Sequence, residues 1–161
     1  MSALLDRLFR RPPLLAEANA GDAAAIAALH GQSFSRGWSE TEIAALLRER
    51  NVLTHRATRG RRLVGFVMSR GAAGETEILS IAVAASERGR GLARRLLDLH
   101  LRRLAGLGCK ALFLEVDEDN TPARRLYARA GFREVGRRNA YYGRTAGGKG
   151  GTALILRRDL A

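Results

Sequence analysis

The segment SERGRGLARRLL (Ser86–Leu97) lies between two apolar patterns of different period. The run ETEILSIAVAA (residues 75–85) before it is rich in aliphatic and β-branched residues and predicts a strand. Apolar residues at helical spacing follow, and these are Leu92, Leu96, Leu97, Leu101 and Leu104. This stripe predicts a helix that ends near Gly106. The glycines of the segment therefore lie where a strand passes into a helix.

The connection that holds Gly89 and Gly91 has three competing interpretations: a loop that binds phosphate, a basic patch for nucleic acid, or an ordinary helix start in an arginine-rich chain. The first turn of a helix has unpaired N–H groups and the positive end of the helix dipole, so it favours an anion. Gly91 has no side chain that would block a phosphate, and Ala93 is nearly as small. Alone, the pattern is weak, because many helices begin with glycine.

Length and composition favour one globular domain. The 161 residues suit a single core, and 46% of them are hydrophobic. We expect an N-terminal arm over residues 1–13 and one domain over residues 14–161. No apolar run is long enough to span a membrane, and the first residues lack the apolar centre of a signal peptide. Since Cys109 is the only cysteine, we expect a cytoplasmic protein without disulfides or a metal site.

The net charge of +12 raises the question of nucleic-acid binding. Of the 28 basic residues only Lys110 and Lys149 are lysines, and the arginines are spread along the chain with few aromatic residues between them. Base stacking needs such aromatic residues. We therefore expect no direct role in nucleic-acid binding, although the positive charge favours an anionic cofactor.

The remaining segments alternate between strand and helix patterns. The expected strands are residues 14–19, 51–60, 61–70, 75–85, 109–116, 132–142 and 151–160. Asp22 is expected to cap a first helix, Ser39 with Glu42 to form a capping box at a second, and Asn120 or Thr121 to cap the last. This order predicts a mixed α/β sheet with helices on its faces.

Several motifs occur together as they do in one known family. RGRGLA (residues 88–93) fits the pattern Gln/Arg-x-x-Gly-x-Gly/Ala, and it lies between SIAV (residues 80–83) and LEVDEDNTPARRLYARAGF (residues 114–132). These motifs resemble the GNAT superfamily of acetyl-CoA-dependent N-acetyltransferases. Trp38-Ser39 and RRNAYY (residues 137–142) resemble the RimI-type branch, whose members acetylate the N-terminal alanine of a small-subunit ribosomal protein.

The resemblance spans roughly Leu14 to Leu160 and implies both a fold and an activity. The implied fold is the α/β GNAT fold, a mixed and mostly antiparallel sheet that is splayed at the cofactor site and has helices on both faces. The implied activity is direct acetyl transfer from acetyl-CoA to the N-terminal α-amine of a protein. Three alternatives stay open: acetylation of a small-molecule amine or a protein lysine, a CoA-sensing module that has lost catalysis, and a basic nucleic-acid-binding domain.

The resemblance also implies where acetyl-CoA binds. The pyrophosphate would lie on the main chain of the loop residues, which are Arg88, Gly89, Arg90, Gly91, Leu92, Ala93 and Arg94. The pantetheine arm would pair with the backbone of Ile81, Ala82 and Val83, whose side chains remain in the core. Asn120 would hydrogen-bond the pantetheine, or it would serve only as a helix cap. No metal is implied.

Two residues are implied in the chemistry. Glu115 near the end of an expected buried strand would accept the amine proton, directly or through a water, and Tyr127 would donate its O–H proton to the departing thiolate. The alternative interpretation is that Glu115 is only an exposed acid at the end of a strand and that Tyr127 is only an aromatic residue of the core. An α-amine has a pKa near 8 against about 10.4 for lysine, so a modest base suffices for a protein N-terminus.

The resemblance implies that the acceptor is bound by three aromatic residues, Trp38, Tyr141 and Tyr142. For Tyr141 and Tyr142 an alternative stays open, that they are only strand-end aromatic residues beside a glycine-rich hairpin. The acidic run Asp117-Glu118-Asp119 either complements the dipole of the next helix or attracts a basic substrate terminus. The expected partners are therefore acetyl-CoA and a protein N-terminus, and no membrane is implied.

Overall fold

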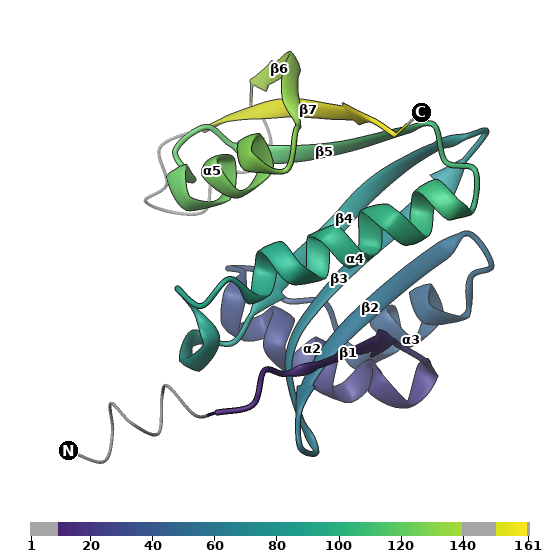
Figure 1. Cartoon of the computed structure of the whole chain (residues 1–161), viewed down its shortest axis with the longest axis vertical. Coiled ribbons are helices and arrows are strands. Elements are labelled where there is room, and N and C mark those ends of the chain that lie inside the picture. The colour runs from purple at the N-terminus through teal and green to yellow at the C-terminus, as the bar shows by residue number, and fades with distance from the viewer. Residues whose placement is uncertain (1–9, 140–150, 161) are drawn as a thin grey trace.

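The computed structural model of the chain describes residues 10–139 and 151–160. In these residues one seven-stranded sheet has the order β1-β2-β3-β4-β5-β7-β6 (Figure 1). The strands are β1 (Leu14–Glu17), β2 (Val52–Arg59), β3 (Arg62–Ala72), β4 (Glu75–Val83), β5 (Ala111–Asp117), β6 (Arg133–Asn139) and β7 (Thr152–Asp159). Neighbouring strands are antiparallel except β4 and β5, which are parallel. The predicted mixed, mostly antiparallel sheet is confirmed.

Helices cover both faces of this sheet. They are α2 (Ala23–Ser33), α3 (Glu40–Arg48), α4 (Leu92–Gly106) and α5 (Thr121–Arg129), with short 3-10 turns η1 (Ala20–Asp22) and η2 (Ala85–Glu87). In Figure 1, α2 and α3 lie behind the sheet, and α4 and α5 lie in front of it. The predicted arrangement of helices on both faces is therefore confirmed as well.

The helix caps agree with the sequence at α3 and differ at α2. Ser39 accepts the N–H of Glu42 at 3.1 Å, and Glu42 accepts the N–H of Ser39 at 2.7 Å, which is the predicted capping box. The prediction for Asp22 was wrong in detail, because its side chain makes no cap bond to α2. The turn η1 directly precedes α2, so the N–H groups that need a cap are those at the start of η1. The side chain of Asn19 accepts the N–H of Gly21 at 2.9 Å.

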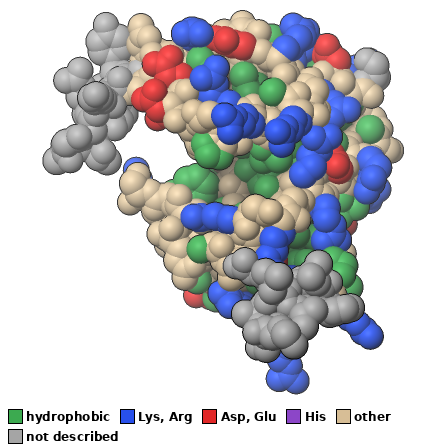
Figure 2. Space-filling view, turned by 60° about the vertical axis from the view of Figure 1, so that its left-hand side comes forward, with side chains coloured by type: hydrophobic (Ala, Val, Ile, Leu, Met, Phe, Trp, Pro, Cys, Tyr) green, Lys and Arg blue, Asp and Glu red, His purple; other side chains and the backbone are tan. Residues whose placement is uncertain are grey.

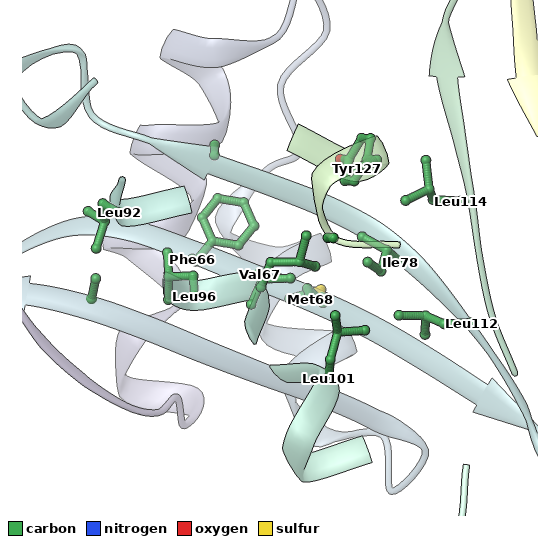
Figure 3. Close-up of a cluster of buried hydrophobic side chains, with 14 of the residues drawn as sticks. Phe66, Val67, Met68, Ile78, Leu92, Leu96, Leu101, Leu112, Leu114 and Tyr127 are labelled. Carbon is green, nitrogen blue, oxygen red and sulfur yellow. The ribbon is translucent and has the colours of Figure 1, made fainter. Parts of the chain in front are cut away.

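The helix α4 is held on the sheet by its leucines. Leu96 and Leu97 have no exposed surface, and Leu101 is also buried (Figure 3). Gly65 of β3 lets the helix approach closely, because a Cβ at this position would lie 2.9 Å from Leu96 Cδ1. Burial of each leucine contributes about 2 kcal/mol. The start of α4, where the glycine-rich connection ends, is therefore fixed relative to β3.

A buried polar contact also joins α4 to the sheet. His100 has no exposed surface, and its two ring nitrogens lie 2.7 Å from His55 Nδ1 on β2 and 2.7 Å from Ser69 Oγ on β3. Burial, with a smaller contribution from His55, lowers the pKa of His100 to about 3. His100 is thus neutral near pH 7, and one N–H donor between the two rings satisfies their contact.

The sheet is open between β4 and β5. These strands pair only from Glu75 to Glu77 with Ala111 to Phe113. An irregularity in the pairing of β3 with β4 follows at once, between Met68 and Ser69. From Ile78 onward the two strands diverge, as Figure 1 shows. The predicted splay is confirmed.

Candidate active site

The open edge of β4 leaves main-chain groups free for a ligand. Ile81, Ala82 and Val83 pair with β3 on one side. On the other side, no strand in the described part of the chain pairs with them. An extended ligand can therefore hydrogen-bond to this edge as an additional strand. Figure 2 shows the surface hollowed on this side, with hydrophobic side chains inside the hollow and Lys and Arg side chains beside it.

The loop after η2 presents a run of free donors. Within the described residues, the backbone N–H groups of residues 89–94 have no hydrogen-bond acceptor. Gly89 and Gly91 have φ values of 75° and 79°, in the left-handed region that other residues avoid. Glycine is thus required by the turn as well as by the space for a ligand. Free N–H groups at a helix start form an anion site.

The loop side chains are arranged around this main chain. Leu92 is buried in the core and Ala93 is half-buried, so both offer a ligand mainly their N–H groups. Arg88 and Arg90 are exposed, while Arg94 pairs with Asp98 of the same helix at 2.9 Å. The two exposed guanidinium groups keep the surface around the loop positive.

Tyr127 lies on the buried side of α5. It is 6% exposed and packs edge-on against Phe132, with ring centroids 5.7 Å apart. Leu114 of β5 and Ile78 of β4 belong to the same hydrophobic cluster (Figure 3), which places Tyr127 at the splay. Burial raises the pKa of Tyr127 to about 12. Its hydroxyl therefore keeps its proton over the whole neutral range.

Asn120 stands at the start of α5 and caps it. Its Oδ1 accepts the N–H of Ala123 at 3.3 Å, so of the two caps that the sequence allowed, Asn120 is the one used. This bond uses the side-chain oxygen only. Among the described residues the amide nitrogen of Asn120 has no acceptor, so both of its donors are available to a ligand at the open end of β5.

Glu115 lies two residues beyond the last β4–β5 pair. Leu114 and Val116 beside it are buried in the cluster with Tyr127, so alternation along the strand places Glu115 on the opposite face. Its carboxylate is partly exposed and lies 2.6 Å from the guanidinium of Arg138 on β6. Glu115 and Tyr127 thus approach the splay from its two faces.

An aromatic stack lies on the face of α2 and α3. The ring of His30 stacks on Trp38, with centroids 4.4 Å apart, and lies 4.4 Å from the ring of Phe34. His30 Nδ1 accepts the backbone N–H of Trp38 at 3.0 Å, and burial lowers the pKa of His30. No local sequence pattern predicts the contact between His30 and Trp38, because it spans the irregular segment between α2 and α3.

The remaining candidate residues for binding the acceptor are Tyr141, Tyr142 and the acidic run Asp117-Glu118-Asp119. Tyr141 and Tyr142 lie outside the described residues. Asp117 accepts the N–H of Asp119 at 2.9 Å and closes the turn before α5, while Glu118 lies 3.6 Å from Arg137. The acidic run is therefore partly engaged in local contacts at this end of the sheet.

Neither a metal site nor a membrane-spanning helix occurs in the described residues. Among the described residues, His, Cys, Asp and Glu form no group of three or more that could hold a metal ion. No helix of the described chain is long and apolar enough to cross a membrane.

Comparisons with known proteins agree with this geometry. Residues 23–132 match the family model described as Acetyltransferase (GNAT) family. The ribosomal protein bS18-alanine N-acetyltransferase of Haemophilus influenzae is 34% identical over 87 residues, which are 54% of this chain and 59% of that protein. A mycothiol acetyltransferase of Streptomyces bingchenggensis is 41% identical over 78 residues, which are 47% of this chain and 25% of that protein.

A solved structure matches over nearly the whole chain. The crystal structure of the ribosomal-protein-S18-alanine N-acetyltransferase from Escherichia coli is 26% identical with a TM-score of 0.84, and the match covers 92% of this chain and 94% of that one. The two curated relatives are matched over less than two thirds of their length. The family model covers most of the chain, including the splayed strands, the loop and α5, and the chain belongs to the acetyltransferase (GNAT) family.

Proposed function

We propose that this chain transfers the acetyl group of acetyl-CoA to the N-terminal α-amine of a protein, with alanine as the first residue and a ribosomal protein as the substrate. The observation that carries the proposal is the continuity between an open strand edge and a loop of free N–H groups, with Glu115 and Tyr127 on the two faces of the same splay. The names and similarity of the relatives support the choice of acceptor.

The cofactor would bind through the main chain. The pantetheine arm extends along Ile81, Ala82 and Val83, and the pyrophosphate lies against the N–H groups of residues 89–94. Asn120 donates its free amide N–H to the arm. No metal takes part in the proposal, because the charge of the phosphates is met by backbone donors and the start of α4.

The transfer step follows from the positions of the two catalytic residues. The amine nitrogen attacks the thioester carbonyl, so a C–N bond forms and the C–S bond breaks. Glu115 takes the proton that the attacking nitrogen loses. Tyr127, protonated and buried, stabilises the sulfur by hydrogen bonding. A thiol has a pKa near 8.5, well below that of Tyr127, so the proton released by the amine is the one that finally neutralises the sulfur.

A second candidate function is acetylation of a small-molecule amine or a protein lysine by the same site. The similarity to a protein named mycothiol acetyltransferase favours keeping this candidate. The lower pKa of an α-amine favours the first candidate, because about a tenth of it is neutral at pH 7 against less than a thousandth of a lysine. We propose that the reaction takes place in the cytoplasm and needs neither a membrane nor nucleic acid.

A pair of peptides distinguishes the two candidates. Both begin with alanine and carry an internal lysine, and one has a blocked α-amine. With acetyl-CoA, mass spectrometry should find one acetyl group at the free N-terminus and none on the blocked peptide. Acetylation of the lysine in the blocked peptide at a comparable rate, or a preference for polyamines, would reject the N-terminal acceptor in favour of the second candidate.

A further inference from the structure

A carboxylate is buried inside the loop that offers the free N–H groups. Glu87 ends the turn η2, directly before Arg88, and is 2% exposed. An anionic cofactor bound to residues 89–94 would come close to this negative charge. A buried carboxylate at such a place repels phosphate unless another group neutralises it.

Arg59, at the end of β2, supplies that neutralisation. Its Nε lies 2.7 Å from one oxygen of Glu87, and its Nη2 lies 3.1 Å from the other, so the contact is bidentate. Hydrogen bonding by Arg59 lowers the pKa of Glu87, and the charges of Arg90 and Arg10 act in the same direction. The carboxylate is therefore ionised and its charge is balanced by a fixed partner.

The same arginine connects the loop to the N-terminal segment. Arg59 Nη1 donates to the carbonyl oxygen of Arg11 at 2.6 Å, and Arg95 of α4 donates to that of Pro13 at 3.4 Å. A cavity of about 800 Å³ lies between this segment and the loop, and among the described residues Glu87 is the one acidic residue in its wall. The remaining charged residues of the wall are Arg10, Arg59, Arg88, Arg90 and Arg95.

We propose that Arg59 is a positioning residue for acetyl-CoA, which acts through Glu87. The pair fixes the turn before Gly89 and removes the negative charge from behind the phosphate site. This inference rests on the proposed function, because it concerns the same cofactor. It assigns to Arg59 an effect on cofactor affinity, while acetyl transfer from the bound cofactor should not depend on it.

A double-substitution experiment tests the pair. We expect Arg59→Met to weaken acetyl-CoA binding by about 10- to 100-fold, because it leaves Glu87 buried, charged and unpaired. Glu87→Gln should change affinity by no more than about threefold. The combination of Arg59→Met with Glu87→Gln should bind within about fivefold of the unchanged protein, since neither charge remains. Calorimetry gives the dissociation constants.

Arg56→Met is the matched control. Arg56 lies on β2 three residues before Arg59 and also pairs with a buried carboxylate, that of Asp22, far from the loop in sequence. Arg56→Met should lower the melting temperature of the protein and leave its affinity for acetyl-CoA unchanged. Arg59→Met should raise the KM for acetyl-CoA and leave kcat and the KM for the peptide within about twofold, a separation that a general loss of stability does not produce.

The outcomes separate this inference from the proposed function. If the unchanged protein binds no acetyl-CoA, the proposed function fails and the inference fails with it. If it binds and Arg59→Met binds equally well, or the double variant is as weak as Arg59→Met, only the inference is wrong. Should Arg59→Met not fold, Glu87→Gln and the double variant are compared, and a loss of more than tenfold between them also overturns it.

Discussion

The two parts of the sheet on either side of the splay are packed very differently. On one side, α4 buries six residues and β3 buries six in succession, from Val64 to Ser69. On the other side, Tyr127 is the buried residue among those of α5, and none of the described residues of β6 is buried. We call β1–β4 with α2, α3 and α4 the thick part, and β5–β7 with α5 the thin part, in which β5 is the strand that buries the most residues, four of its seven.

In the proposed site, most cofactor-binding groups lie on one side of the splay and the two catalytic residues lie on the other. The open edge and the loop, which bind the cofactor, belong to the thick part or follow directly from it. Glu115 and Tyr127, which act on the reacting atoms, belong to β5 and α5 in the thin part, where Asn120 is the one residue proposed to contact the cofactor. Binding and chemistry should therefore respond to different substitutions, and each prediction below tests that division.

The largest effect is expected at the loop. Gly91→Glu adds a negative charge at the phosphate site and forces a side chain into the left-handed conformation, where φ is 79°. It should abolish acetyl-CoA binding by calorimetry while circular dichroism shows a folded domain. Gly74→Glu is the matched control, because Gly74 also has a positive φ of 83° but lies in the exposed turn between β3 and β4. Normal binding by Gly91→Glu would remove the loop from the site.

In the thin part, the effect should fall on turnover. Because Tyr127→Phe removes a hydrogen-bond donor to the developing charge on sulfur, it should lower kcat by about 100- to 1,000-fold with little change in acetyl-CoA affinity. Glu115→Gln should do the same, most severely at low pH, where less of the amine is neutral. Glu134→Gln, which changes an exposed carboxylate of β6, is the control. Wild-type turnover by both site variants across neutral pH would contradict direct transfer with these roles.

The sequence predicted those features that depend on short segments. The capping box at Ser39, the turn at Gly60 and the helix over residues 92–106 all follow from local patterns, and the structure has them. The loop and the residues around Glu115 and Tyr127 were located through the family resemblance. Their roles stay predictions that the substitutions above test.

Contacts between distant segments could not be predicted in this way. Arg59 and Glu87 are 28 residues apart, and Glu115 and Arg138 are 23 apart. In a chain with 28 basic residues, nothing local shows which arginine faces which carboxylate. The order of the strands and the alternation of side chains along them determine which arginine pairs with which carboxylate. Both are properties of the folded sheet.

A smaller effect is expected on the stability of the thick part at acid pH. Because the pKa of His100 is about 3 when folded and near 6.5 when unfolded, the unfolded chain binds more protons between these values. Stability is therefore full above pH 6.5 and decreases as the pH falls toward 3. At pH 5 protonation of His100 in the unfolded chain should lower the free energy of unfolding by about 2 kcal/mol, which lowers the melting temperature by roughly 4 to 8 °C.

Calorimetric melting at pH 7.5, 6 and 5 measures this slope. The pKa of His55 is also lowered by burial, so it adds to the loss in the same direction. His100→Gln should be less stable at pH 7.5 and should show a flatter decrease between pH 7.5 and 5. An unchanged slope in this variant would mean that the contact between α4, His55 and Ser69 is not what makes the thick part acid-sensitive.

The smallest effect is expected at the ion pair that holds the proposed base. Arg138 lies 2.6 Å from Glu115, and both side chains are partly exposed, so the pair is worth less than about 1 kcal/mol. A substrate ammonium group can replace the guanidinium at little cost, but it must compete with the guanidinium for Glu115.

Arg138→Met should therefore lower the peptide KM by about two- to fivefold, more strongly at low salt. Arg133→Met is the control, because Arg133 is also an exposed arginine of β6 but pairs with Asp159 instead. A higher peptide KM in Arg138→Met alone would show that Arg138 binds the peptide and does not compete with it, and the thin part would then contribute to peptide binding as well as to chemistry.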